Sequence, residues 1–207
     1  MKPGFVVLTD AAPDILTDIR YYSTYNFTGR RVTGYDEPLA IVTEKCAAAL
    51  ADLSRLAKER GYRFKVFDAY RPASAVKSFV DWTKTPGDEE MKPFFFPDTE
   101  KPEIIPLGYI SANSSHCSGS TVDMTLFDMK TGRELDMGTP FDYFDPRSHH
   151  YCTEGLTEKQ IENRAILDSI LLDNGFKTIS TEWWHFTLID EPYPDVAFDF
   201  PVSRFAE

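Results

Sequence analysis

Two of the four histidines in this sequence stand near carboxylates in patterns that could hold a metal ion. His116 is followed seven residues later by Asp123, which interrupts an otherwise apolar segment with the pattern of a strand. His185 lies in a second hydrophobic segment, three residues after Glu182. An isolated buried carboxylate is costly, so Asp123 needs a partner or a metal. Each histidine alone is better explained as a core side chain bonded to backbone, but the two together favour a metal site.

These four residues are the parts that a catalytic zinc site needs. Two histidines and one carboxylate typically bind such a zinc ion and leave the fourth position for water, whose pKa falls to about 7. Glu182 is then the candidate general base, because a second carboxylate must pass the proton of water to the leaving amine. Residues three apart on a regular strand point to opposite faces, so Glu182 must lie at the start of a strand or on a bulge. The alternative for Glu182 is a solvated carboxylate at a strand end.

The elements that must position these residues follow from the apolar pattern. Helices are expected at 39–60, from Pro72 to about Trp82 and at 157–173, and strands at 62–67, 120–127, 176–180 and 183–189. The proline-rich segment 85–106 is expected to be a long loop, and 190–207 an irregular tail. Helices beside a group of strands predict an α+β fold. We expect a single domain over 1–207, with a central, mainly antiparallel sheet flanked by helices and the zinc site on the sheet.

Composition excludes several classes of partner. The net charge of -11 argues against nucleic acid and against an anionic membrane surface, both of which attract basic proteins. The N-terminal apolar run is too short for a signal peptide and no stretch is long enough to span a membrane, so a cytoplasmic location is predicted. Three cysteines without CxxC spacing (Cys46, Cys117 and Cys152) indicate neither a disulfide framework nor a cysteine zinc site.

Longer motifs carry a resemblance to a known family. Ser-x-His-x-x-Gly-x-x-x-Asp at 114–123, with Glu-x-x-His at 182–185, resembles the zinc D-Ala-D-Ala peptidases. The segments Asn26–Gly29, Asp68–Pro72 and Met137–Asp142 narrow it to the D-alanyl-D-alanine dipeptidases of the vancomycin-resistance type. The resemblance runs from about residue 5 to 190. It implies hydrolysis of D-Ala-D-Ala to two D-alanines, with one zinc ion per chain on His116, Asp123 and His185 and with Glu182 as the base.

The same resemblance implies residues for the substrate, which is a small zwitterion. Asp142 resembles the anchor of the amine, with Tyr21 as a hydroxyl partner. Ser114 and Ser115 could offer hydroxyl and backbone donors to the carboxylate. Arg71 could stabilise the oxyanion of the tetrahedral intermediate, a contribution of roughly 3–4 kcal/mol per donor.

Each of these residues also has a purely structural alternative. Arg71 could only pair with Asp68, Asp142 could cap a loop, and Tyr21 could be one more core aromatic. His149 and His150 follow a polar loop and are interpreted as solvated or structural.

The sequence departs from the family pattern at Cys117, Ser118 and Thr121. These neighbours of the ligands should affect packing more than chemistry, although specificity is in doubt if position 118 normally supplies a cation.

Two other functions stay open at this stage. The nearer one is a zinc D,D-carboxypeptidase that acts on peptidoglycan stem peptides, and Asp142 argues against it because an amine anchor shortens the site. The other is a zinc-stabilised binding module that has lost catalysis, which would need neither Glu182 nor Arg71. Antibiotic resistance, wall turnover and use of D-alanine as a nutrient all share this chemistry, so the sequence does not separate them.

Overall fold

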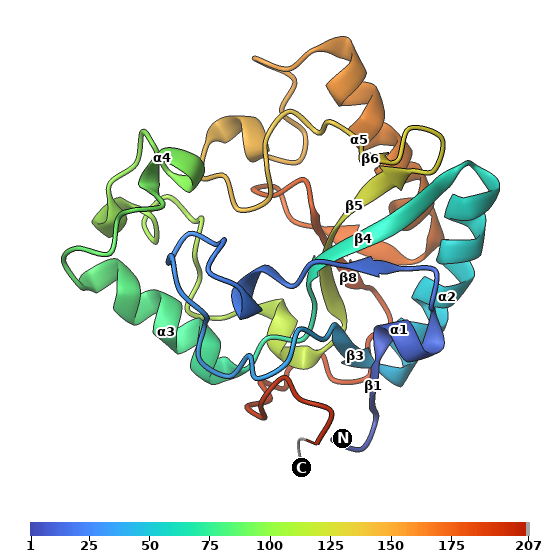
Figure 1. Cartoon of the computed structure of the whole chain (residues 1–207), viewed down its shortest axis with the longest axis horizontal. Helices are drawn as coiled ribbons and strands as arrows, with labels where there is room; N and C mark the ends of the chain where they lie inside the picture. Colours follow the sequence, from blue (N-terminus) through green and yellow to red (C-terminus); the bar gives the residue numbers. More distant parts are fainter. Residues whose placement is uncertain (206–207) are drawn as a thin grey trace.

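A six-stranded mixed sheet lies at the centre of the structure (Figure 1). The strands are β2 (Leu16–Thr17), β4 (Tyr62–Asp68), β5 (Thr121–Asp128), β6 (Arg133–Glu134), β7 (Phe176–Thr178) and β8 (His185–Leu188). Their order is β2-β4-β5-β8-β7, and β6 pairs with the C-terminal end of β5. Only the short β2–β4 pair is parallel. This computed structural model describes residues 1–205, and within them the predicted α+β fold with a mainly antiparallel sheet is confirmed.

The central strand β5 has one apolar and one polar face. Val122, Met124 and Leu126 alternate along it with Thr121, Asp123 and Thr125, and all six are buried. Because successive side chains of a strand point to opposite faces, the sheet turns its apolar set one way and Asp123 the other way. A polar face that is nevertheless buried marks the side of the sheet on which to look for a site.

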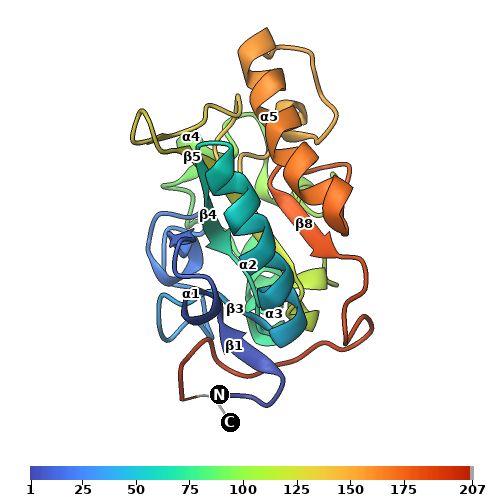
Figure 2. The same ribbon diagram turned by 90° about the vertical axis from the view of Figure 1, so that its right-hand side faces the viewer.

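Two long helices cover the apolar face. Helices α2 (Glu44–Glu59) and α5 (Glu158–Leu171) lie together on one side of the sheet (Figure 2). α2 buries Cys46, Leu50, Leu53 and Ala57, whose spacing of three and four residues forms one helical stripe. α5 begins with a capping box between Thr157 and Gln160, as its sequence predicts.

The opposite side of the sheet carries α3 (Ala73–Lys84; Figure 1). This helix buries Phe79 and Trp82. The loop predicted at 85–106 lies beyond it, and contains only the short α4 (Lys92–Phe95) and the 3-10 turn η2 (Lys101–Glu103). The remaining short turns are α1 (Leu8–Ala11), η1 (Arg20–Tyr22), η3 (Ser115–Ser118), η4 (Pro146–Ser148) and η5 (Leu172–Asn174).

The helix expected over 39–60 is wrong at its start. Residues Ile41–Thr43 form strand β3, which pairs antiparallel with β1 (Phe5–Val7), and α2 begins only at Glu44. Three β-branched residues in a row fit a strand better than a helix. The side chain of Thr43 accepts a hydrogen bond from the backbone N–H of Cys46, so Thr43 is the N-cap that separates the two elements.

The expected tail at 190–207 is irregular over its described part, and residues 206–207 lie outside the described residues. Phe198 and Phe200 pack edge-on against Phe5, each with ring centres 5.0 Å apart. The backbone N–H of Phe198 donates to the carbonyl of Cys117, so the tail is fastened beside the His116 segment. Among residues 1–205, no helix combines the length and apolar character that a membrane crossing requires.

Candidate active site

Sheet register brings together two of the three predicted ligands. Asp123 on β5 lies directly opposite His185 on β8, so their side chains share the polar face of the sheet. A shift of one residue would turn either side chain to the helix-covered face. The flanking pairs, Val122 with Phe186 and Thr121 with Thr187, hold this register through buried contacts.

The third ligand, His116, lies on the 3-10 turn η3 just before β5. The turn ends at Gly119, whose φ of 81° is left-handed. A Cβ atom at that glycine would clash with the ring of Phe5, so only glycine fits there. The carbonyl of His116 accepts the backbone N–H of Arg71 at 3.2 Å, which fixes the two segments to each other.

Three ligand atoms converge on one point. Oδ1 of Asp123 lies 3.2 Å from Nε2 of His116 and 3.3 Å from Nδ1 of His185. All three side chains are buried, and Oδ1 of Asp123 has no hydrogen-bond partner among residues 1–205. A buried carboxylate oxygen that faces two ring nitrogens and bonds to neither is the arrangement that a cation completes.

The other ring nitrogen of each histidine is already occupied. Nδ1 of His116 lies 2.7 Å from the carbonyl of Ala69, which can only accept, so Nδ1 carries a hydrogen and Nε2 is the nitrogen that faces Asp123. Nε2 of His185 lies 3.1 Å from Oγ of Ser115. Such outer partners fix the orientation of metal-binding histidines. Two nitrogens and one carboxylate oxygen with a free fourth side fit the donor set of a catalytic zinc ion.

The electrostatics of the cluster point the same way. Burial opposes the charged form of His185, yet the carboxylates of Asp123 and Glu182, 3.3 and 3.4 Å from its Nδ1, stabilise that form and raise the pKa of His185 to about 9. Burial also acts to raise the pKa of Asp123, but the two imidazoles hold it well below its usual range. In the absence of a metal, the proton on His185 offsets the negative charges of Asp123 and Glu182. A divalent cation bound between these residues would offset the same charges.

Glu182 lies just before a strand, as a general base three residues before His185 requires. Strand β8 begins at His185, and Glu182 lies in the turn before it, where the rule of alternating faces does not apply. Its Oε2 is 3.4 Å from Nδ1 of His185. The side chain is 20% exposed, so the carboxylate borders both the ligand cluster and the open cavity.

Arg71 pairs with Asp68 and also lines the cavity. Its Nε donates to Oδ2 of Asp68 at 2.9 Å, and its Nη2 lies 3.5 Å from Oδ2 of Asp123. Burial alone would lower the pKa of Arg71, but Tyr21 and Asp68 outweigh it and raise that pKa well above its usual value. The guanidinium is therefore a fixed positive charge beside the ligands, rather than only the partner of Asp68.

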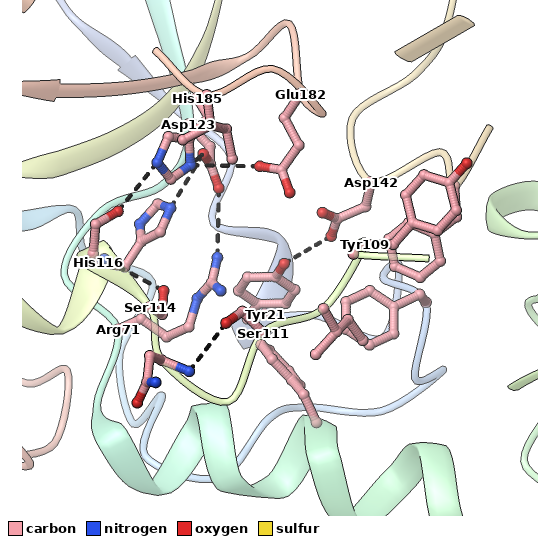
Figure 3. Close-up of a pocket in the computed structure, with 18 residues that line it drawn as sticks. Tyr21, Arg71, Tyr109, Ser111, Ser114, His116, Asp123, Asp142, Glu182 and His185 are labelled. Carbon is pink, nitrogen blue, oxygen red and sulfur yellow. Dashed lines mark hydrogen bonds and ion pairs between the residues drawn. The ribbon is translucent and has the colours of Figure 1, made fainter. Parts of the chain in front are cut away.

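Asp142 and Tyr21 form the opposite wall of the cavity (Figure 3). The Tyr21 hydroxyl donates to Oδ2 of Asp142 at 2.8 Å, and both side chains are buried. Burial raises the pKa of Tyr21, and Asp142 adds to the shift, so the phenol keeps its proton. Burial also raises the pKa of Asp142 well above its usual value, which means that this carboxylate lacks a full positive partner.

The two serines face different tasks. Ser114 caps η3, because its hydroxyl accepts the backbone N–H of His116 at 3.3 Å. The hydroxyl of Ser115 lies against His185, so it can orient that ligand. Both residues line the cavity, and their predicted contacts with a substrate carboxylate stay a prediction.

The cavity between these groups has a volume of about 330 Å³. That is near the lower end of the range for small-molecule sites, roughly 300–1,000 Å³. Its lining includes three carboxylates (Asp123, Asp142 and Glu182) but only one guanidinium, that of Arg71. With these four groups ionised and both histidines neutral, as metal ligands are, the lining carries a charge of -2, which one divalent cation would cancel.

Several supporting contacts were not anticipated. Asp68, at the end of β4, accepts the Tyr35 hydroxyl at 2.7 Å and lies 3.7 Å from Nδ1 of His116. The only feature of the sequence that could have indicated this role of Asp68 is its position as a carboxylate at the end of an apolar strand. His150, interpreted as solvated or structural, is buried and contacts the turn that carries Glu182.

The three departures from the family pattern lie around the ligands, and none of them is a ligand. The hydroxyl of Thr121 bonds that of Thr187 at 2.8 Å across the sheet. Ser118 donates to the carbonyl of Ser115 at 2.8 Å, and the Cys117 side chain is buried. Thr121 and Ser118 thus make hydrogen bonds and Cys117 is packed in the interior. That these departures affect packing more than chemistry stays a prediction.

Comparison with known proteins identifies the family. Residues 1–203 match the family described as D-ala-D-ala dipeptidase, Peptidase_M15. The chain belongs to this family. It is 40% identical to a D-alanyl-D-alanine dipeptidase of Enterococcus faecalis and 39% identical to one of Enterococcus faecium, in both cases over 98% of this chain and 100% of the relative. A D-alanyl-D-alanine dipeptidase of Streptomyces coelicolor is 36% identical over the same shares.

A solved structure also aligns, with a TM-score of 0.44 and 15% identity over 76% of this chain and 78% of the other. It is a mutant of the vancomycin resistance D,D-pentapeptidase VanY, in complex with Zn(II).

Family membership confirms the resemblance drawn from the motifs, and with it the predicted class of zinc metallopeptidase. The predicted ligands His116, Asp123 and His185 are brought together among the described residues. The roles of the individual residues stay predictions, because no comparison tests them.

Proposed function

We propose that this member of the dipeptidase family hydrolyses free D-Ala-D-Ala to two molecules of D-alanine with one zinc ion per chain. The observation that carries the proposal is Asp142, a buried carboxylate without a full positive partner on the wall of a small cavity. A free dipeptide offers an ammonium group to such a carboxylate, whereas an interior residue of a longer peptide offers an uncharged amide. One divalent cation would neutralise the charge of the cavity lining, and a zwitterionic substrate then adds no net charge to the cavity.

In the proposed site, zinc on His116, Asp123 and His185 supplies the Lewis acidity that makes water a nucleophile near neutral pH. Glu182 accepts the proton of the attacking water and delivers it to the nitrogen of the leaving D-alanine. Arg71 donates to the oxygen on which negative charge develops, and its bond to Asp68 keeps the guanidinium in place.

The substrate ends are held on both sides of the reacting carbonyl. Asp142 accepts the ammonium group through a charge-assisted hydrogen bond, with the Tyr21 hydroxyl as its second partner. We assign Ser114 and Ser115, which line the cavity next to His116, to the carboxylate end of the substrate. Holding both ends converts the reaction to an intramolecular one, which lowers the entropic part of the barrier.

The test is a comparison of four substrates with the zinc-loaded protein: D-Ala-D-Ala, L-Ala-L-Ala, N-acetyl-D-Ala-D-Ala and a stem pentapeptide. We expect free alanine from D-Ala-D-Ala with a kcat/KM at least tenfold above that for the other three, since about 1.4 kcal/mol makes one decade. Equal rates on free and N-blocked substrates would favour the D,D-carboxypeptidase. Metal binding without turnover of any substrate would favour the binding module.

We also propose that the chain acts as one domain over 1–207 and that its substrate is a cytoplasmic dipeptide. The described residues contribute to one hydrophobic core, which supports the first point. The negative net charge supports the absence of nucleic-acid and membrane partners.

A further inference from the structure

The proposed general base lies two residues after an exposed stretch of the chain. Glu182 belongs to the turn between β7 and β8, in which Ile179 and Ser180 are exposed. Exposed turns are usually more mobile than the strands that they connect. A displacement of about 1 Å in a reacting group can reduce a rate roughly a hundredfold. The base therefore needs ties outside its own turn.

Both arms of this turn are tied to one short segment. The backbone N–H of His150 donates to the carbonyl of Ser180 at 3.0 Å. The backbone N–H of Trp183 donates to the carbonyl of Ser148, also at 3.0 Å. These two bonds hold the residues on either side of Glu182, and any residue type could make them.

The His150 side chain adds contacts that depend on the imidazole. Nδ1 lies 2.9 Å from Oγ1 of Thr178 and 3.3 Å from the carbonyl of Glu182 itself. The Thr178 hydroxyl lies 2.8 Å from the carbonyl of His185 and donates to it, so the contacts continue to the start of β8. The ring thus lies between the base and a ligand, and it touches the backbone rather than either side chain.

The far side of the same ring is anchored in helix α5. Nε2 of His150 lies 3.1 Å from Oδ2 of Asp168. The imidazole itself is 1% exposed, so water is no substitute for these partners. α5 packs on the sheet, and the ring therefore connects an exposed turn to a rigid part of the fold.

From this geometry we infer that His150 is a positioning residue for the general base: it fixes the backbone of Glu182 between α5 and the start of β8. The inference rests on the proposed role of Glu182. The His150 ring does not contact the three ligand atoms, and it meets Glu182 at the backbone carbonyl rather than at the carboxylate. The Thr178 hydroxyl extends these contacts to the backbone of His185. Its loss should reduce kcat while zinc and substrate still bind.

The primary test replaces the imidazole with a somewhat larger ring that has no polar atom. His150→Phe removes all three polar contacts of the ring, and His150→Asn restores a polar atom near the position of Nδ1. We expect His150→Phe to lower kcat by about 10-fold to 100-fold, as misplacement of a reacting group does. KM and zinc content should stay near those of the parent, and His150→Asn should recover part of kcat. The matched control is His149→Phe, which keeps an aromatic ring near Tyr109 and should leave kcat unchanged.

A double variant separates positioning from general destabilisation. Glu182→Asp moves the carboxylate back along its own chain and retains a base. If His150 acts through Glu182, His150→Phe combined with Glu182→Asp should lose less than the product of the two single losses. The inference would be overturned if the loss of kcat in the double variant equalled the product of the two single losses. It would also be overturned if His150→Phe folded, bound zinc and had a normal kcat. If Glu182→Gln stays active, the base assignment itself fails, and that result is distinct from either.

Thr178→Val gives a second route if His150→Phe does not fold. It removes one hydroxyl from the same set of contacts at nearly constant volume. We expect a smaller loss of kcat with unchanged KM and full zinc content. A Thr178→Val variant with the parent's kcat would argue against the chain of contacts from His150 to the start of β8.

Discussion

Asp142→Asn is the substitution that best tests how this site recognises its substrate. Asn keeps the shape of the side chain and can still accept the Tyr21 hydroxyl. It also suits the backbone, because Asp142 has a φ of 62° and Asn tolerates the left-handed region better than Ala. The exchange therefore removes the negative charge and little else.

The expected loss follows from the buried position of Asp142. A carboxylate and an ammonium about 4 Å apart attract by about 4 kcal/mol at an effective dielectric constant of 20. Removing one partner of a buried charge pair costs about 2–5 kcal/mol. Taking 2–4 kcal/mol, kcat/KM for D-Ala-D-Ala should fall by about 30-fold to 1,000-fold at 1.4 kcal/mol per decade. N-acetyl-D-Ala-D-Ala has no ammonium group, so its slower hydrolysis should change little.

The same exchange should make the fold more stable at neutral pH. Burial raises the pKa of Asp142 above its unfolded value of about 3.9, with the nearby Asp123 and Glu182 adding to the effect. The folded state then holds this proton at a pH where the unfolded chain has lost it, so stability falls as pH rises above about 4. Each pH unit between the two pKa values removes up to about 1.4 kcal/mol. Asn does not ionise and avoids this loss.

The assay has two parts. Steady-state kinetics of the zinc-loaded proteins compare free and N-acetylated dipeptide, and thermal unfolding of the metal-free proteins compares Tm at pH 4 and pH 7. We expect Asp142→Asn to match the parent near pH 4 and to exceed it at pH 7. Equal losses on both substrates would refute the role of Asp142 as amine anchor. A lower Tm than the parent at pH 7 would refute the account of its burial.

The remaining predictions concern the metal and the base. His116→Ala and His185→Ala should each abolish stoichiometric zinc binding in metal analysis, whereas His149→Ala should retain one zinc per chain; the reverse pattern would contradict the ligand assignment. Glu182→Gln should keep zinc and lose at least about 10²–10⁴-fold in kcat, the usual contribution of a general base. Near-normal turnover by this zinc-loaded variant would exclude Glu182 as the base.

The chemistry of this site was easier to predict from the sequence than its geometry. His116, Asp123 and His185 attract notice because polar side chains interrupt apolar segments, and burial of a polar group needs a reason. Their meeting point depends on the register of β5 and β8, which are far apart in the chain. Nothing local in either segment states that Asp123 pairs with His185.

Contacts made by the backbone escaped prediction for a related reason. The carbonyl of Ala69 orients His116, and the identity of the Ala69 side chain has no part in that contact. The strand Ile41–Thr43 was hidden because its partner, Phe5–Val7, lies far away in sequence. Helical spacing downstream of Thr43 was strong enough to extend the predicted helix over it. Non-local pairing overrode the local pattern there.

The site also divides into a rigid part and a part that depends on one segment. The metal ligands lie on paired strands and on a turn bonded to them, but Asp142 and the ties to the Glu182 turn both belong to residues 137–150. Arg164 of α5 holds this segment, because it donates to the carbonyls of Met137, Arg147 and His149. Burial lowers the pKa of Arg164 to about 10, so its charge persists at neutral pH and strengthens those bonds. Amine recognition by Asp142 and proton transfer by Glu182 therefore both depend on the segment 137–150, whereas the metal ligands are held by the sheet and by η3.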